Sequence, residues 1–149
     1  MPDGDLLFLY HDGDTWSVKP VSKRRTPFSL SGGGTKRIPI SRPQLLIDHQ
    51  DRLIFIYRDI ERQNRVTLAV CEDFENNKWR VSDISNFSVG QWESCYDTEL
   101  WKSANRLDIF VQTVGQGDLE QVENMVPQTV YILEWKLSIV PYPIARLLN

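Results

Sequence analysis

The sequence predicts an all-β protein built from antiparallel strands. Short apolar runs recur along its 149 residues, polar turns separate them, and no stretch keeps a helical period. One strand pattern also repeats, because residues 5–12 align with residues 52–59, and residues 106–112 align with residues 52–58. Repeats of about 50 residues are typical of propeller blades. We therefore expect about two and a half to three four-stranded antiparallel blades of a β-propeller.

Composition and charge narrow the class of partner. Hydrophobic residues make up 41% of the chain, and the net charge of −3 gives no basic field that would attract nucleic acid. The sequence has no apolar run of about 18 residues, and its first residues lack the basic and apolar regions of a signal peptide. We therefore expect neither nucleic acid nor a membrane as a partner, and the sequence leaves the localisation open.

The two cysteines, Cys71 and Cys95, each fall at the edge of a predicted strand. A small buried thiol is the usual state of such a residue. A disulfide or a metal site would need partners that the spacing does not supply, so we expect no metal ion and no other cofactor.

Residues 1–40 are expected to hold the end of one blade and a loop. Residues 6–10 are apolar at every position, which predicts a strand covered on both faces. After a turn that begins at His11, residues 15–21 alternate as a half-buried strand does. Residues 22–40 contain three consecutive glycines and five basic residues. They lack the context of a phosphate-binding loop, so we predict an exposed connection.

Residues 41–88 predict one complete blade. Strands are expected at residues 41–47, 52–58 and 65–71, with a fourth around Trp79. Short polar turns join them, as in the four antiparallel strands of a propeller blade.

Residues 89–140 predict a second blade, which a tail at residues 141–149 follows. Its first two strands are expected at residues 92–101 and 106–112, on either side of a polar turn.

An insertion at residues 113–128 separates these strands from a further one at residues 129–135. Within the insertion, the spacing of Leu119, Val122 and Val126 predicts a turn or two of helix.

Hairpin geometry places several polar residues at one end of the predicted blades. Antiparallel pairing carries Arg42 toward Arg58, and Tyr96 toward Gln112. The repeat gives His11 the place of Arg58 in the preceding blade. We therefore expect these five side chains to line one rim of three neighbouring blades.

The chemistry of this rim suits an anionic sugar. Arginine binds carboxylates bidentately, glutamine and tyrosine can hydrogen-bond sugar hydroxyls, and histidine or tyrosine can move a proton. An ordinary polar strand end explains the same residue types equally well, so both explanations stay open. The candidates for substrate binding are Arg42, Arg58, Gln112 and Glu93, and those for catalysis are His11 and Tyr96.

Three carboxylates also fit glycoside hydrolysis, in which two acidic groups flank the scissile bond. Asp97 and Glu99 are two residues apart and are expected on one strand face, while Glu93 precedes that strand. Hydrogen bonding between blades is an equally good use for these residues.

Several segments together carry a resemblance to a known family: Ser41–Pro43, Asp51–Leu53, Tyr57–Asp59, Val89–Glu93, Tyr96–Lys102, Phe110–Gln112 and Val114–Asp118. Over about residues 5–135 the chain closely resembles the BNR repeat-containing family, which is similar to sialidase-like propellers. The resemblance implies the C-terminal portion of a seven-bladed propeller. It also implies a carbohydrate-active protein, either a polysaccharide lyase or a glycoside hydrolase of acidic polysaccharides, and a periplasmic or secreted location.

Three functions from different classes follow. As a lyase, the protein would neutralise a uronate carboxylate with Arg42 and Arg58 and abstract a proton with His11 or Tyr96. As a binding protein, it would hold a polysaccharide or oligosaccharide without cleaving it. As a truncated propeller, it would expose blade edges that need a partner or self-association.

Overall fold

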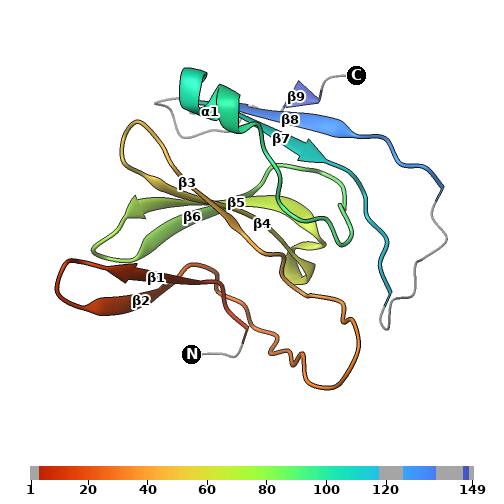
Figure 1. Cartoon of the computed structure of the whole chain (residues 1–149), viewed down its shortest axis with the longest axis horizontal. Helices are drawn as coiled ribbons and strands as arrows, with labels where there is room; N and C mark the ends of the chain where they lie inside the picture. Colours follow the sequence, from red (N-terminus) through yellow and green to blue (C-terminus); the bar gives the residue numbers. More distant parts are fainter. Residues whose placement is uncertain (1–3, 118–125, 137–145, 148–149) are drawn as a thin grey trace.

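The structure is a computed structural model that describes residues 4–117, 126–136 and 146–147. The described residues form three antiparallel sheets that lie in layers (Figure 1). One short α-helix and one turn of 3-10 helix complete the secondary structure of this part of the chain. The prediction of a mainly antiparallel β fold is confirmed.

The first sheet is a hairpin of β1 (Leu7–His11) and β2 (Trp16–Pro20). The Asp12 carboxylate closes its turn by accepting hydrogen bonds from the backbone N–H groups of Asp14 and Thr15, at 2.9 and 2.8 Å. The prediction that this first strand is covered on both faces is wrong. Leu7 and Leu9 are exposed, because no described strand packs on the outer side of this hairpin.

The central sheet has four strands in sequence order, each antiparallel to its neighbour. They agree with the strands predicted for residues 41–88 to within a few residues. A 3-10 turn, η1, joins the second and third strands, and polar turns join the others. The elements are β3 (Gln44–Ile47), β4 (Leu53–Asp59), η1 (Ile60–Arg62), β5 (Arg65–Asp73) and β6 (Lys78–Asp83).

Strand β4 is buried on both of its faces. Ile54 and Ile56 belong to the hydrophobic cluster shared with the third sheet, whereas Phe55 and Tyr57 belong to the cluster shared with the first sheet. Side chains of a strand alternate between its two faces, so the unbroken apolar run fits a strand between two neighbouring layers. The central sheet is thus the middle layer, and each of the other two sheets packs on one of its faces.

The third sheet consists of β7 (Arg106–Val111), β8 (Tyr131–Lys136) and β9 (Arg146–Leu147), in that order. The strands predicted at residues 106–112 and 129–135 are therefore confirmed. Two residues of the predicted insertion helix, Leu119 and Val122, lie outside the described residues, and Val126 is exposed in an irregular segment.

The strand predicted at residues 92–101 is wrong over its second half, which forms helix α1 (Thr98–Ala104). The Asp97 carboxylate caps this helix by accepting hydrogen bonds from the N–H groups of Glu99 and Leu100, both at 2.9 Å. Asn105 ends it in the left-handed conformation, with φ of 50°. The residues just before the helix do pair with β7, where Tyr96 lies opposite Ile109.

The turn between β3 and β4 is held by one buried carboxylate. Asp48 accepts hydrogen bonds from the backbone N–H groups of Gln50 and Arg52, both at 2.9 Å, and from Nε of Arg52 at 2.7 Å. Burial alone would raise the pKa of Asp48, but these hydrogen bonds and the Arg52 charge outweigh it and hold the pKa below its ordinary value.

We predict that Asp48 contributes to acid sensitivity. Its lowered pKa stabilises the fold above the pKa of the unfolded chain, about 3.9, and this contribution is lost as the pH falls through the lower pKa of the folded state. Asp48→Asn should therefore lose less free energy of unfolding than the wild type between about pH 5 and pH 3 in urea titrations. An unchanged pH dependence in this variant would contradict the assignment.

Candidate functional site

Arg58, near the end of β4, is the largest of the fully buried side chains in the described part of the chain, with 1% exposed. Its guanidinium makes four hydrogen bonds. Nε donates to the Trp92 carbonyl at 3.1 Å, and Nη2 donates to Oε1 of Gln91 at 2.9 Å. Nη1 donates to the Ile38 carbonyl at 2.9 Å and to Oδ1 of Asn64 at 3.2 Å. The guanidinium is therefore bound by the protein itself.

The environment of Arg58 is that of a structural cation. Burial lowers the pKa of Arg58 from its ordinary value, while the negative charges of Glu93 and Asp59 act in the opposite direction. A buried charge is costly unless polar atoms satisfy it, and the four acceptors supply this compensation. The predicted role of Arg58 in holding a substrate carboxylate would require breaking these bonds.

A tight backbone crossing positions two of these acceptors, which belong to Gln91 and Trp92. Gly90 has a φ of 59°, and a Cβ at this position would lie 2.1 Å from the Val114 carbonyl oxygen. Only glycine allows both features at this place. The N–H of Gln91 then donates to the same carbonyl at 2.8 Å, which fixes the segment beside Arg58.

Arg42 shares its strand end with Arg58, as predicted, but its side chain points elsewhere. The neighbouring Ser41 donates its N–H to the Arg58 carbonyl at 3.0 Å. The side chain of Arg42 is exposed and forms an ion pair with Glu93, with 3.8 Å between Nε and Oε2. The backbone N–H of Arg42 also donates to Oε2 of Glu93 at 3.1 Å. These two residues form an accessible pair on the surface.

Tyr96 and Gln112 do not meet in the predicted way. Tyr96 lies opposite Ile109 and packs against the cluster between the central and third sheets, so its register with β7 differs from the predicted one. Gln112 is exposed, and its Nε2 donates to the Gln128 carbonyl at 3.0 Å. The second half of the strand predicted at residues 92–101 belongs to helix α1, so it cannot pair with β7 as predicted.

His11 lies at the opposite end of the layers from Arg58, so its predicted place on a shared rim is wrong. The ring of its neighbour Tyr10 contacts Phe74, with 4.9 Å between centroids, in the turn that joins β5 to β6. Arg58 is at the other end of β4. His11 itself is exposed, stacks edge-on against Trp16 and accepts a hydrogen bond from the Gly13 N–H at 3.1 Å.

The turn of the β1 and β2 hairpin is similar to the turn between β5 and β6. Both turns begin with an aspartate whose carboxylate accepts backbone hydrogen bonds, from Thr15 in the case of Asp12 and from Asn76 in the case of Asp73. The alignment of residues 5–12 with residues 52–59 rests on apolar runs that any buried strand shares.

The predicted pair of acidic residues on one strand face is also wrong. Asp97 caps helix α1 with its carboxylate, and Glu99 projects from that helix to form an exposed ion pair with Lys102 at 3.4 Å. Glu93 lies in the preceding segment, paired with Arg42. The three carboxylates thus have separate local partners.

The cysteines differ in environment. Cys71 is buried, as predicted, but Cys95 is exposed, because Ser94 and Tyr96 on either side of it turn toward the protein interior. Within the described residues, no group of three or more His, Cys, Asp or Glu side chains is arranged to hold a metal ion.

A buried ion pair that the sequence did not indicate lies in the segment predicted as an exposed loop. Arg24, a residue of this segment, binds the Asp59 carboxylate through its Nη1, and both side chains are almost fully buried. Glu61 lies beside them and accepts hydrogen bonds from the N–H groups of Arg25 and Thr26. No local alternation indicated this pair, because Val21, Ser22 and Arg24 are all buried and Lys23 between them is exposed.

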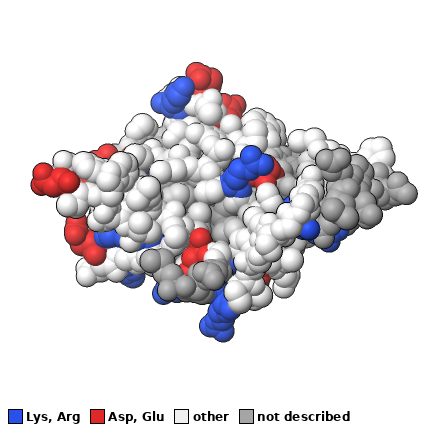
Figure 2. All heavy atoms as spheres, turned by 60° about the horizontal axis from the view of Figure 1, so that its bottom comes forward, with Lys and Arg blue, Asp and Glu red and all other residues white. Residues whose placement is uncertain are grey.

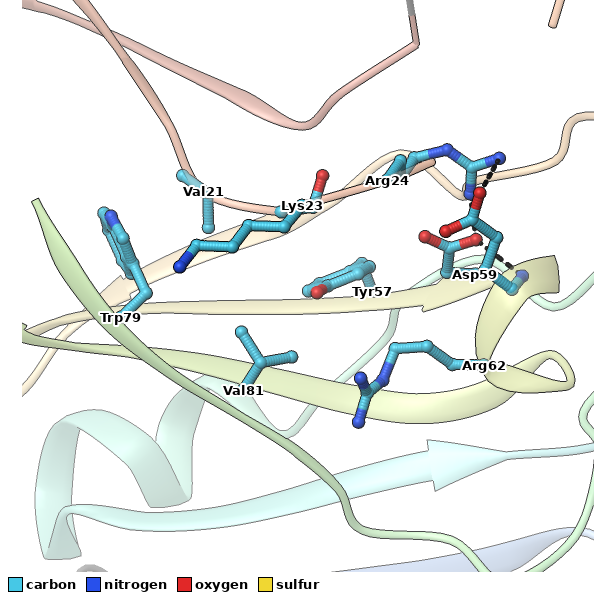
Figure 3. Close-up of a pocket in the computed structure, with 10 residues that line it drawn as sticks. Val21, Lys23, Arg24, Tyr57, Asp59, Arg62, Trp79 and Val81 are labelled. Atoms are coloured by element: carbon cyan, nitrogen blue, oxygen red, sulfur yellow. Dashed lines mark hydrogen bonds and ion pairs between the residues drawn. The ribbon is translucent and has the colours of Figure 1, made fainter. Parts of the chain in front are cut away.

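A cavity of about 300 Å³ opens next to this ion pair, between residues 21–24 and the central sheet (Figure 3). The side chains that surround it come from segments far apart in the sequence, which explains why no local pattern indicated it. They are Val21, Ser22, Lys23, Arg24, Tyr57, Asp59, Glu61, Arg62, Trp79 and Val81.

The face shown in Figure 2 carries no broad patch of one charge. On the face shown in Figure 2, acidic and basic side chains lie in small groups and leave most of the surface uncharged. Such a face has no broad field that would attract a polyanion by charge alone, so recognition would depend on specific contacts.

Comparison with protein-family models and with curated protein sequences found no match for this chain. The resemblance to BNR repeat proteins therefore remains a prediction from the sequence. In the described residues, no helix is long and apolar enough to cross a membrane.

We predict that Arg58 stabilises the fold. Arg58→Met removes four hydrogen bonds and leaves buried acceptors unpaired, which should lower the free energy of unfolding by about 3 kcal/mol or more. Arg42→Met is the control, because an exposed ion pair should change it by less than about 1 kcal/mol. Urea denaturation of both variants measures the difference. Equal, small effects would show that Arg58 is not a structural cation.

Proposed function

We propose that this chain is part of a carbohydrate-binding β-propeller and that its three sheets are neighbouring blades. The observation that carries the proposal is the central sheet, a four-stranded antiparallel meander covered on both faces by other sheets. A propeller blade has this number and order of strands and this two-sided burial. The resemblance of the sequence to BNR repeat proteins supports the same assignment.

The neighbouring sheets fit the same scheme. Strands β1 and β2 take the place of the last two strands of a preceding blade, since the turn of their hairpin is similar to the turn between β5 and β6. In the third sheet, the residues around Tyr96 pair with β7, and β8 and β9 follow. This arrangement gives the third sheet four consecutive antiparallel segments.

The outer face of the first sheet supports a larger assembly. Four large apolar side chains are exposed on it: Leu7 at 45%, Leu9 at 57%, Trp16 at 69% and Val18 at 46%. Leu9 and Val18 lie directly opposite each other in the hairpin, so the exposed groups are contiguous. Exposed apolar faces of this kind mark contact surfaces. We propose that a further blade covers this face.

A binding role is favoured over catalysis. Among the described residues, the candidate base His11 and the candidate cation Arg58 lie at opposite ends of the central sheet, and Arg58 is occupied by protein acceptors. The lyase chemistry predicted for this pair is therefore not part of the proposal. Arg42 and Glu93 remain accessible, and a guanidinium beside a carboxylate can bind both acidic groups and hydroxyls of a sugar chain.

The proposal predicts that the protein binds an acidic polysaccharide through Arg42. Affinity electrophoresis in gels that contain alginate should retard the wild-type chain, and a gel that contains a neutral glucan should not. Arg42→Gln should weaken the retardation constant about tenfold, because one charge-assisted hydrogen bond contributes about 1.5 kcal/mol or more.

Lys102→Gln, which removes an exposed charge from helix α1, serves as the control and should bind as the wild type does. If alginate and other uronate-rich polysaccharides all fail to retard the protein, or if both variants bind equally weakly, the proposed function is wrong.

A further inference from the structure

The cavity between the first two layers has the size and walls of a small-molecule site. Its volume of about 300 Å³ is at the lower end of the range found for ligand pockets. Val21, Trp79 and Val81 give it apolar walls, and Figure 3 shows these three side chains on the side toward which the Tyr57 hydroxyl points. A ligand that fits would be about the size of one ring with a short substituent.

Tyr57 supplies an unused hydrogen-bonding group at this cavity. The residue is 1% exposed, and its hydroxyl points into the space among Lys23, Trp79 and Val81 (Figure 3). Within the described residues, this hydroxyl has no hydrogen-bond partner, although a buried tyrosine hydroxyl usually has one. Burial raises the pKa of Tyr57 well above its ordinary value, so the group stays protonated and can donate.

The other charged side chains at the cavity have partners within the protein, although the buried Nε of Arg24 has no hydrogen-bond partner among the described residues. Arg24 is paired with Asp59, and Arg62 donates from its Nε to Asp83 at 2.6 Å. The Glu61 carboxylate accepts backbone hydrogen bonds from the loop.

Lys23 is the remaining cation. Its side chain extends across the cavity in Figure 3, and it has no ion-pair partner in the part of the chain that the structure describes. An ammonium group on a flexible four-carbon stem can move to meet an anion. Lys23 and Tyr57 therefore offer two donors to the same space, one charged and one neutral.

We propose that this cavity binds a small organic carboxylate, whose carboxylate accepts hydrogen bonds from Nζ of Lys23 and the Tyr57 hydroxyl. The body of the ligand packs against Val21, Trp79 and Val81. Charge-assisted hydrogen bonds of this kind are short and strong in a partly enclosed site. The site lies between two layers and is independent of the Arg42 and Glu93 surface, so it does not depend on the proposed polysaccharide binding.

Two carboxylates and their neutral counterparts test the proposal by isothermal titration calorimetry. Benzoate represents aromatic acids and D-glucuronate represents sugar acids, whereas benzyl alcohol and D-glucose have similar bodies without the charge. We expect saturable binding of at least one of the two acids. Its neutral counterpart should bind at least tenfold more weakly, and the preferred acid distinguishes an aromatic from a sugar ligand.

The variants Lys23→Gln and Tyr57→Phe should each weaken binding at least tenfold. Both are expected to fold, since Lys23 is exposed and Tyr57→Phe keeps the ring that packs in the core, and circular dichroism checks this. Lys36→Gln, in the same loop, removes an equal charge and should bind as the wild type does.

Three results would overturn the proposal. These are no saturable binding of either acid, equal binding of the neutral counterparts, and unchanged binding by folded Lys23→Gln.

Discussion

The structure depends on the burial of β4 on both faces. Alternate side chains of this strand enter two different hydrophobic clusters, one shared with the first sheet and one shared with the third. The alternation continues into the polar end of the strand. Arg58 turns to the side of the third sheet and binds Trp92, whereas Asp59 turns to the side of the first sheet and binds Arg24. Each layer is therefore joined to the central one by an apolar cluster and by one buried charged group.

Because of this arrangement, polar residues at the strand ends have a structural role where the sequence suggested a ligand-binding role. Arginine, glutamine and tyrosine at such positions suggest a sugar-binding rim, because these types bind carboxylates and hydroxyls. In this protein the Arg58 guanidinium instead donates hydrogen bonds to the backbone carbonyls of Trp92 and Ile38, which the sheets leave unpaired. Unused donors lie elsewhere, on Tyr57, Lys23 and Nε of Arg24 beside the cavity. The position of free donors therefore decides where a ligand binds, and residue type alone does not.

The central sheet could be predicted from the sequence because its strands and turns are local patterns. Helix α1 could not, since seven residues are too few to show a helical period, and Asp97 was interpreted as a strand residue rather than as a cap. The predicted place of His11 was wrong because the repeat was aligned on apolar residues, whereas the turn at Asp12 is similar to the turn at Asp73. The cavity depends on three segments that only the packing of layers brings together.

Both faces of β4 are buried, and we expect the outer face of the first sheet, which exposes Leu9 and Trp16, to be buried against another surface as well. Sedimentation velocity across the micromolar range tests this most directly. The account predicts concentration-dependent association of the chain through this face, which the double variant Leu9→Ser, Trp16→Ser abolishes and Ile60→Ser, at an exposed site in η1, leaves intact. A wild-type chain that stays monomeric at every concentration, or equal association of the double variant, would contradict it.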